Sequence, residues 1–148
     1  MTTTTINTVN NATTYGMHLT VRISHVEKQA VLNDRDAVAG FLSDLVDRVG
    51  MRVLAGPLVG IEEGVPEKRG MSAVIILYES HAAIHTYPEL GEAFLDLFSC
   101  KRFSSDQVMN ALSDYFGNFN VVEQSVADRG IHWGPNVETE MSKWSLRR

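Results

Sequence analysis

The sequence has little of what marks several classes of protein. It has one cysteine in 148 residues, so no intrachain disulfide can form, and a reducing cytoplasm is the expected compartment. No apolar run reaches the roughly 20 residues that a membrane helix needs. Acidic residues outnumber Lys and Arg by 18 to 13, and the basic clusters are as short as Lys101-Arg102 and Arg147-Arg148. We therefore expect neither a membrane protein nor a nucleic-acid-binding protein.

The two ends of the chain differ in composition from the part between them. Residues 1–15 are rich in Thr and Asn and have neither a basic start nor an apolar stretch, so we do not expect a secretory signal. They offer too little apolar area to offset the entropy of ordering, which predicts a disordered tail. Residues 16–128 suit one domain. Residues 129–148 show no clear period and are expected to be a C-terminal tail.

The hydrophobic pattern predicts several strands. Apolar residues alternate over 17–26, less regularly over 51–61, and again over 120–126. Residues 72–78 (SAVIILY) are almost continuously apolar, which is typical of a central strand. Residues 92–100 alternate as well and are predicted as a strand, although the same residues would also fit a short helix.

Two segments have the apolar spacing of amphipathic helices. The first covers residues 33–49, with Asn33 or Asp34 as its N-cap, and the second covers 104–116, where Ser104 and Gln107 form a capping box. The order of elements predicts an α+β fold. We expect a two-layer α/β sandwich whose sheet is largely antiparallel and carries both helices on one face.

The chemistry of the chain is concentrated between residues 79 and 100. Ser80 directly follows Glu79, His85 comes five residues later, and the lone cysteine is Cys100. A hydroxyl, a base and a thiol could build a catalytic group from the polypeptide itself, and the rest of the sequence has no cofactor motif. Alone, such a serine would more often be a structural residue at a strand end, and such a cysteine a small buried one.

These residues resemble the bacterial and archaeal class of S-adenosylmethionine decarboxylases, which are self-cleaving pyruvoyl enzymes. That family has Glu-Ser-His, three residues, His-Thr-aromatic-Pro-Glu, and then a strand that ends in Ser/Thr-Cys. The chain reads ESHAAIHTYPE and then EAFLDLFSC, and the likeness covers about residues 16–126. Three departures concern the substrate pocket: Tyr87 replaces the usual tryptophan, Lys101-Arg102 replaces a common glycine, and the loop 62–70 lacks an aromatic residue placed against adenine.

The resemblance implies how the catalytic group would form. The chain would cut itself between Glu79 and Ser80, and Ser80 would become a pyruvoyl group, the cofactor of the decarboxylation. His85 would remove the α-proton of Ser80, and Ser72 would hydrogen-bond the peptide group being cleaved.

The resemblance also implies residues that act in turnover. Cys100 would protonate the α-carbon after carbon dioxide leaves. Tyr87 would stack on adenine or meet the sulfonium, and Glu89 would accept hydrogen bonds from the ribose. A different role is open to His81 and His85, which could ligate a metal as an i,i+4 pair. That pair would need a helix, against which Pro88 argues, so no metal is expected.

The function implied is decarboxylation of S-adenosylmethionine, which supplies the aminopropyl donor for spermidine synthesis. The enzyme would be a cytoplasmic homodimer of processed protomers with its active site at their interface. Two alternatives stay open. A decarboxylase of ornithine or arginine would keep the mechanism and change the substrate, as the pocket departures suggest. A non-catalytic family member would only bind a partner.

Overall fold

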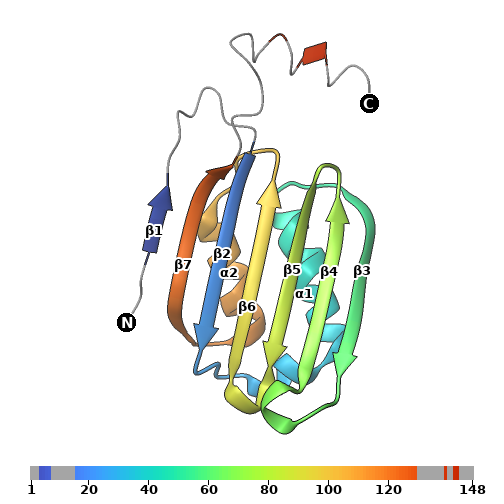
Figure 1. Cartoon of the computed structure of the whole chain (residues 1–148), viewed down its shortest axis with the longest axis vertical. Helices are drawn as coiled ribbons and strands as arrows, with labels where there is room; N and C mark the ends of the chain where they lie inside the picture. The colour runs from blue at the N-terminus through green and yellow to red at the C-terminus, as the bar shows by residue number, and fades with distance from the viewer. Residues whose placement is uncertain (1–3, 8–15, 130–138, 140–141, 144–148) are drawn as a thin grey trace.

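The computed structural model of the chain describes residues 4–7, 16–129, 139 and 142–143. Within them, one seven-stranded sheet has the strand order β1-β7-β2-β6-β5-β4-β3 (Figure 1). The strands are β1 (Thr4–Asn7), β2 (Gly16–Ser24), β3 (Val53–Glu62), β4 (Gly70–Leu77), β5 (Ser80–Tyr87), β6 (Glu92–Ser99) and β7 (Asn120–Arg129), and the helices are α1 (Arg35–Arg48) and α2 (Ser105–Phe116). Strand β1 runs parallel to β7, and the other neighbouring strands are antiparallel.

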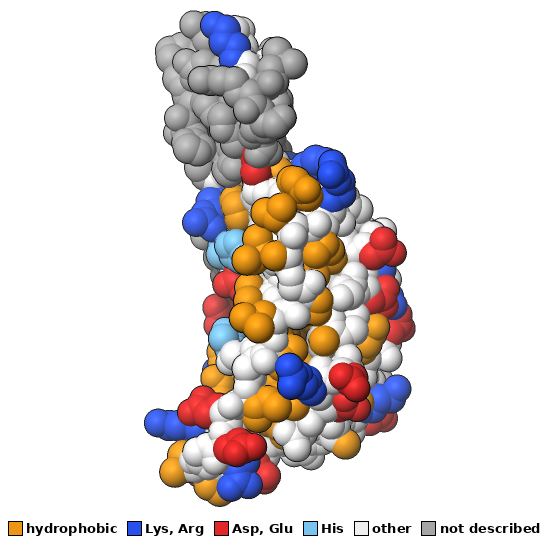
Figure 2. Space-filling model, turned by 90° about the vertical axis from the view of Figure 1, so that its right-hand side faces the viewer, with side chains coloured by type: hydrophobic (Ala, Val, Ile, Leu, Met, Phe, Trp, Pro, Cys, Tyr) orange, Lys and Arg blue, Asp and Glu red, His pale blue; other side chains and the backbone are white. Residues whose placement is uncertain are grey.

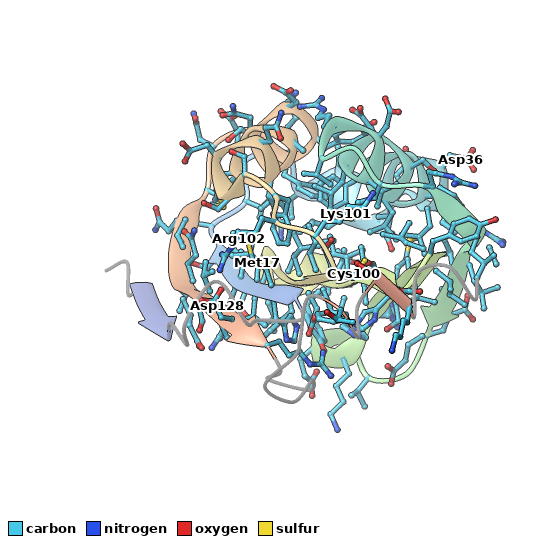
Figure 3. All side chains as sticks on the ribbon, turned by 90° about the horizontal axis from the view of Figure 1, so that it is seen from above. Met17, Asp36, Cys100, Lys101, Arg102 and Asp128 are labelled. Atoms are coloured by element: carbon cyan, nitrogen blue, oxygen red, sulfur yellow. The ribbon has the colours of Figure 1, made fainter. Side chains whose placement is uncertain are left out.

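Both predicted helices form, and they cover the same face of the sheet (Figures 1 and 3). The N-cap of α1 is Asp34, whose side chain accepts a hydrogen bond from the Ala37 amide at 3.1 Å. The N-cap of α2 is Ser104, whose hydroxyl accepts a hydrogen bond from the Gln107 amide at 3.4 Å. These caps satisfy amides that have no partner inside the helix. The two helices pack against each other and against the inner side of the sheet.

The predicted fold class, a two-layer sandwich with a largely antiparallel sheet, is confirmed. Strand β6 forms where both a strand and a short helix fitted the sequence, and its inward residues Ala93, Leu95 and Leu97 are at most 3% exposed. Each pairs with a residue of β2 whose side chain is equally buried. Alternation with a period of two therefore sets both the type of this element and its register.

Strand β5 was not among the predicted strands. It occupies Ser80–Tyr87, the segment that holds the serine and histidine of the motif. Its inner side carries Ala82, Ile84 and Thr86, which are small or polar enough to weaken the apolar signal. Thr86 is buried because its hydroxyl donates to the Leu32 carbonyl at 2.7 Å and accepts from the Met71 amide at 3.1 Å. The motif therefore lies in the middle of the sheet.

Parts of both predicted tails lie outside the described residues. Of residues 1–15, Thr4–Asn7 form β1 and the remainder are outside, as is most of 130–148. No helix of the described residues is long and apolar enough to cross a membrane.

The face of the sheet opposite the helices carries many partly exposed side chains, and we call it the open face. Its residues alternate with the buried ones along the four central strands. They are His18, Thr20, Arg22, Ser72, Val74, Ile76, His81, Ala83, His85, Tyr87, Phe94, Asp96 and Phe98. Figure 2 looks at the adjoining edge, where β3 ends the sheet on this side and where the exposed apolar residues Val53, Leu54, Leu58 and Ile61 lie.

Candidate active site

The predicted cleavage bond lies in the tight turn between β4 and β5. Leu77 pairs with Ser80, so only Tyr78 and Glu79 form the loop. Glu79 has a φ of 61°, in the left-handed region that hairpin turns normally give to Gly or Asn. For a residue with a side chain this conformation costs about 1–2 kcal/mol. The backbone is therefore strained at the residue whose carbonyl would be attacked.

The Ser80 hydroxyl is held next to the only thiol of the chain. Ser80 is 8% exposed, and its Oγ accepts a hydrogen bond from the Cys100 amide at 3.1 Å. The same oxygen lies 3.8 Å from Cys100 Sγ, which is itself 4.0 Å from the Tyr78 carbonyl oxygen. Cys100 follows the last residue of β6, so the alternation of that strand no longer fixes where its side chain points. The structure thus brings together two of the three predicted catalytic residues.

A pocket of about 480 Å³ opens beside this pair. It is lined by Gly50, Met51, Arg52, Tyr78, Ser80, Ser99, Cys100 and Lys101. The guanidinium of Arg52 lies 4.5 Å from the centre of the Tyr78 ring. The volume suits a small molecule, and the two basic side chains suit a carboxylate. A serine hydroxyl held beside a thiol in the lining of such a pocket fits a catalytic group made from Ser80.

Ser72 and His85 form a second pair, away from Ser80. They face each other across β4 and β5, with Ser72 Oγ 2.7 Å from His85 Nδ1. His85 is five residues beyond Ser80 on the same extended strand, which separates them by about 16 Å. Because five is an odd number, their side chains point to opposite faces of the sheet. Within one chain the structure does not bring His85 and Ser72 to the cleavage bond.

The two predicted substrate-contacting residues belong with His85 rather than with Ser80. Tyr87 ends β5, and its ring meets Phe94 edge-on with 5.8 Å between ring centres. Glu89 follows in the short 3-10 helix η4 (Pro88–Leu90). On the open face, His85 and Tyr87 also line a pocket of about 640 Å³. The predicted site is therefore divided into two halves, one at each end of β5.

Other polar pairs on the open face were not predicted. His18 Nε2 bonds Asp96, and Arg22 bonds Glu92 at 3.2 Å. Each pair joins residues 70 or more positions apart, so no local signal in the sequence could have identified it. The spacing needed for the alternative His81–His85 metal pair is absent, because residues four apart on a strand lie about 13 Å from each other.

Comparison with known proteins agrees with this geometry. The chain matches the S-adenosylmethionine decarboxylase family over residues 17–130. An S-adenosylmethionine decarboxylase proenzyme of Clostridium kluyveri is 31% identical, over 78% of this chain and 87% of that protein. One of Methanococcus aeolicus is 29% identical, over 73% of this chain and 90% of that protein.

A solved structure shares the fold. The crystal structure of the adenosylmethionine decarboxylase from Aquifex aeolicus superimposes with a TM-score of 0.67, at 20% identity, over 83% of this chain and 97% of that chain. The resemblance seen in the motif thus extends over most of the sequence and over the arrangement of the sheet and helices. This chain belongs to the S-adenosylmethionine decarboxylase family.

Proposed function

We propose that the chain is a proenzyme that cuts itself before Ser80 and then decarboxylates S-adenosylmethionine with the pyruvoyl group made from that serine. The observation that carries the proposal is the turn at residues 77–80. There, a strained Glu79 precedes a serine whose hydroxyl is held by Cys100. Strain and a fixed nucleophile are what an unactivated hydroxyl needs to attack its neighbouring carbonyl.

The self-cleavage can be followed atom by atom. Ser80 Oγ attacks the carbonyl carbon of Glu79, the C–N bond breaks, and an ester joins the two segments. A base then removes the α-proton of Ser80, and the bond between Oγ and Cβ breaks, which leaves Glu79 with a new carboxylate. Addition of water to the resulting dehydroalanine releases ammonia and leaves a ketone at residue 80. The products are residues 1–79 and residues 80–148.

In turnover, the pyruvoyl ketone would withdraw electrons from the substrate carbon that loses carbon dioxide. The chain's own residues would position the substrate and supply a proton. The Cys100 thiol lies beside Ser80 and is placed to protonate the α-carbon. Arg52 and Lys101 would hold the amino-acid end of the substrate in the adjoining pocket. A catalytic thiol must stay reduced, which suits the cytoplasm.

The divided site points to a homodimer in which each site uses two chains. Ser80 and Cys100 lie at one end of β5, whereas His85 and Ser72 face the other way, about 16 Å along the strand. The open face also exposes apolar side chains, including Ile76 at 46% and Phe94 at 40%. A second copy packed on this face would cover these side chains and could place its own His85–Ser72 pair at the end of the sheet, beside the turn that holds the Glu79–Ser80 bond. Tyr87 and Glu89 of the same copy would then face the substrate.

A mass spectrum of the denatured, purified protein tests the processing. We expect two fragments for the wild type, with a pyruvoyl group at the start of the second, and one uncut chain for Ser80→Ala. Two fragments from Ser80→Ala, or a single seryl-containing chain from the wild type, would contradict the proposal. Release of carbon dioxide from S-adenosylmethionine, ornithine and arginine should be measured in parallel. We expect turnover of the first only, and turnover of either other substrate instead would identify a same-mechanism relative.

A further inference from the structure

We propose that the ion pair between Arg102 and Asp128 positions Cys100 for proton transfer. This inference rests on the proposed function, since it assigns a role toward the same thiol. Arg102 lies two residues after Cys100. Asp128 lies in β7, which is separated from β6 by β2.

The ion pair joins a partly exposed guanidinium to a buried carboxylate. Arg102 Nη2 lies 2.5 Å from Asp128 Oδ1, and the Asp128 side chain is only 2% exposed. A carboxylate removed from water is costly unless a cation lies beside it. The other oxygen, Oδ2, is buried and has no hydrogen-bond partner in the described structure. Arg102 therefore compensates a charge that would otherwise be poorly satisfied, and the backbone at residue 102 is held in place by it.

The ion pair lies at the end of the sheet that holds the thiol. Asp128 pairs with Met17, and Met17 pairs with Ser99, the residue before Cys100. Figure 3 shows Met17, Arg102 and Asp128 together at the end of the sheet where Cys100 and Lys101 also lie. The segment that carries the thiol is thus fixed on both sides, at Ser99 by the sheet and at Arg102 by the ion pair.

The next residue of β7 holds the same segment from the opposite face. The guanidinium of Arg129 lies 4.4 Å from the centre of the Phe98 ring. Arg129 pairs with Gly16, where a Cβ would come within 2.3 Å of the Ser99 carbonyl oxygen. Consecutive residues of β7 therefore contact Phe98 of β6 and Arg102, just beyond the end of β6, from opposite faces of the sheet. This arrangement leaves Cys100 little freedom relative to Ser80, as proton transfer over a short distance requires.

Three variants test the inference: Arg102→Met, Arg102→Lys and Asp128→Asn, with Arg48→Met as the matched control. Arg48 also forms an ion pair, but with Asp44 and Asp114 on the helices. Two readouts are needed, the kinetics of decarboxylation and the rate at which iodoacetamide alkylates Cys100. The second is unambiguous because the chain has one cysteine, and it does not depend on the enzyme's activity.

We expect Arg102→Met and Asp128→Asn to lower kcat by about tenfold or more while KM changes less. Both should raise the alkylation rate at high pH several-fold, because the thiol is less restrained. Arg102→Lys keeps the positive charge and should retain most of the wild-type kcat and alkylation rate. Unchanged alkylation and kcat in Arg102→Met and Asp128→Asn, or equal changes in Arg48→Met, would overturn the inference. If the wild type released no carbon dioxide, the proposed function would fail, and alkylation would still decide whether the ion pair restrains Cys100.

Discussion

At the scale of the residue, the left-handed backbone of Glu79 is the feature most directly linked to chemistry. In the described part of the chain, two residues other than glycine have a positive φ, Glu79 and His25. His25 follows the last residue of β2 and so lies at one end of the sheet. Ser80 contacts Cys100, just beyond the end of β6, and that end of β6 pairs with the start of β2. Ser80 therefore lies at the other end of the sheet. The strain at Glu79 is therefore local to the bond that is expected to break.

A pair of substitutions at Glu79 isolates this strain. Glu79→Ala removes the carboxyl group and keeps the strained backbone, whereas Glu79→Gly also relieves the strain. If about 1 kcal/mol of strain is released during acyl transfer, Glu79→Gly should cut roughly fivefold more slowly than Glu79→Ala. The rate is measured by following the uncut chain on denaturing gels after synthesis.

His25→Gly provides the control for that experiment. It relieves the same kind of backbone strain at a position remote from Ser80, so its cleavage rate should equal that of the wild type. Equal rates for Glu79→Gly and Glu79→Ala would show that the turn contributes nothing to cleavage.

The types and spacing of Ser80, His85 and Cys100 led to their prediction as site residues, and their roles stay a prediction. The separation of His85 from Ser80 and Cys100 in the structure was not predicted from the sequence. Residues 80–87 alternate between buried and more exposed side chains, and a strand assignment there would have placed Ser80 and His85 on opposite faces. The same residues form both the motif and a period-two pattern, and only the motif was recognised in the sequence.

At the scale of the element, the ion pairs of Arg48 link the two helices. Arg48, in the last turn of α1, contacts Asp44 at 2.8 Å and reaches Asp114 of α2 at 2.6 Å. Its hydrogen bond to Asp44 holds the pKa of that carboxyl below its ordinary value. A carboxyl whose pKa is lower in the folded state stabilises the fold above its unfolded pKa of about 3.9, and this contribution is lost as the pH falls through the folded pKa.

Arg48→Met should therefore show a stability defect that depends on pH. We expect the variant to have a lower free energy of unfolding than the wild type at pH 7, and the difference to shrink as the pH is lowered below about 4. Urea denaturation at pH 7, 4 and 3 measures the difference. A difference that persists or grows toward acid would show that the arginine acts through packing rather than charge.

Element prediction succeeded where the inward side chains are large and apolar. The helices and β6 were found because Leu, Val and Phe recur at the right spacing, and Asp34 and Ser104 mark the helix starts. Strand β5 was not predicted, because its buried side has Ser80, Ala82 and Thr86 beside a single large apolar residue, Ile84. Burial of such residues depends on partners elsewhere in the chain, such as the Leu32 carbonyl that accepts from Thr86.

At the scale of the whole molecule, the shared site can be tested by mixing two inactive proteins. Ser80→Ala lacks the nucleophile and His85→Ala lacks the base, so each should stay uncut alone. In a mixed dimer, the His85→Ala chain has Ser80 and its partner has His85, so the His85→Ala chain should be cut. Random pairing of co-expressed chains would cut about half of the His85→Ala chains. The fragments are identified by mass.

The outcome separates the two arrangements of the site. Cleavage only in the mixture would show that the base comes from another chain. Cleavage of His85→Ala alone would remove His85 from the reaction, and no cleavage in the mixture would favour a site within one chain that rearranges before it reacts.

The whole-molecule arrangement is the part that the sequence could not supply. The His18–Asp96 and Arg102–Asp128 contacts join residues that are adjacent only after the sheet has assembled. Their types are common on surfaces, and the two residues of each contact belong to segments far apart in the sequence. The single sequence thus indicated the family of the chain but not these contacts.

The strand order has a consequence for the cut protein. The first fragment would keep β1, β2, β3 and β4, and the second would keep β5, β6 and β7, yet β2 lies between β6 and β7. The two pieces are interleaved, so separating them means breaking the backbone hydrogen bonds of four strand pairs at once, β1–β7, β2–β7, β2–β6 and β4–β5. Once cut, the enzyme should hold together in the native state but renature poorly after urea, at a rate that rises with concentration, whereas the uncut Ser80→Ala chain should renature as one piece. The proenzyme would then be the form that folds, and the mature enzyme a form that can only be reached through it.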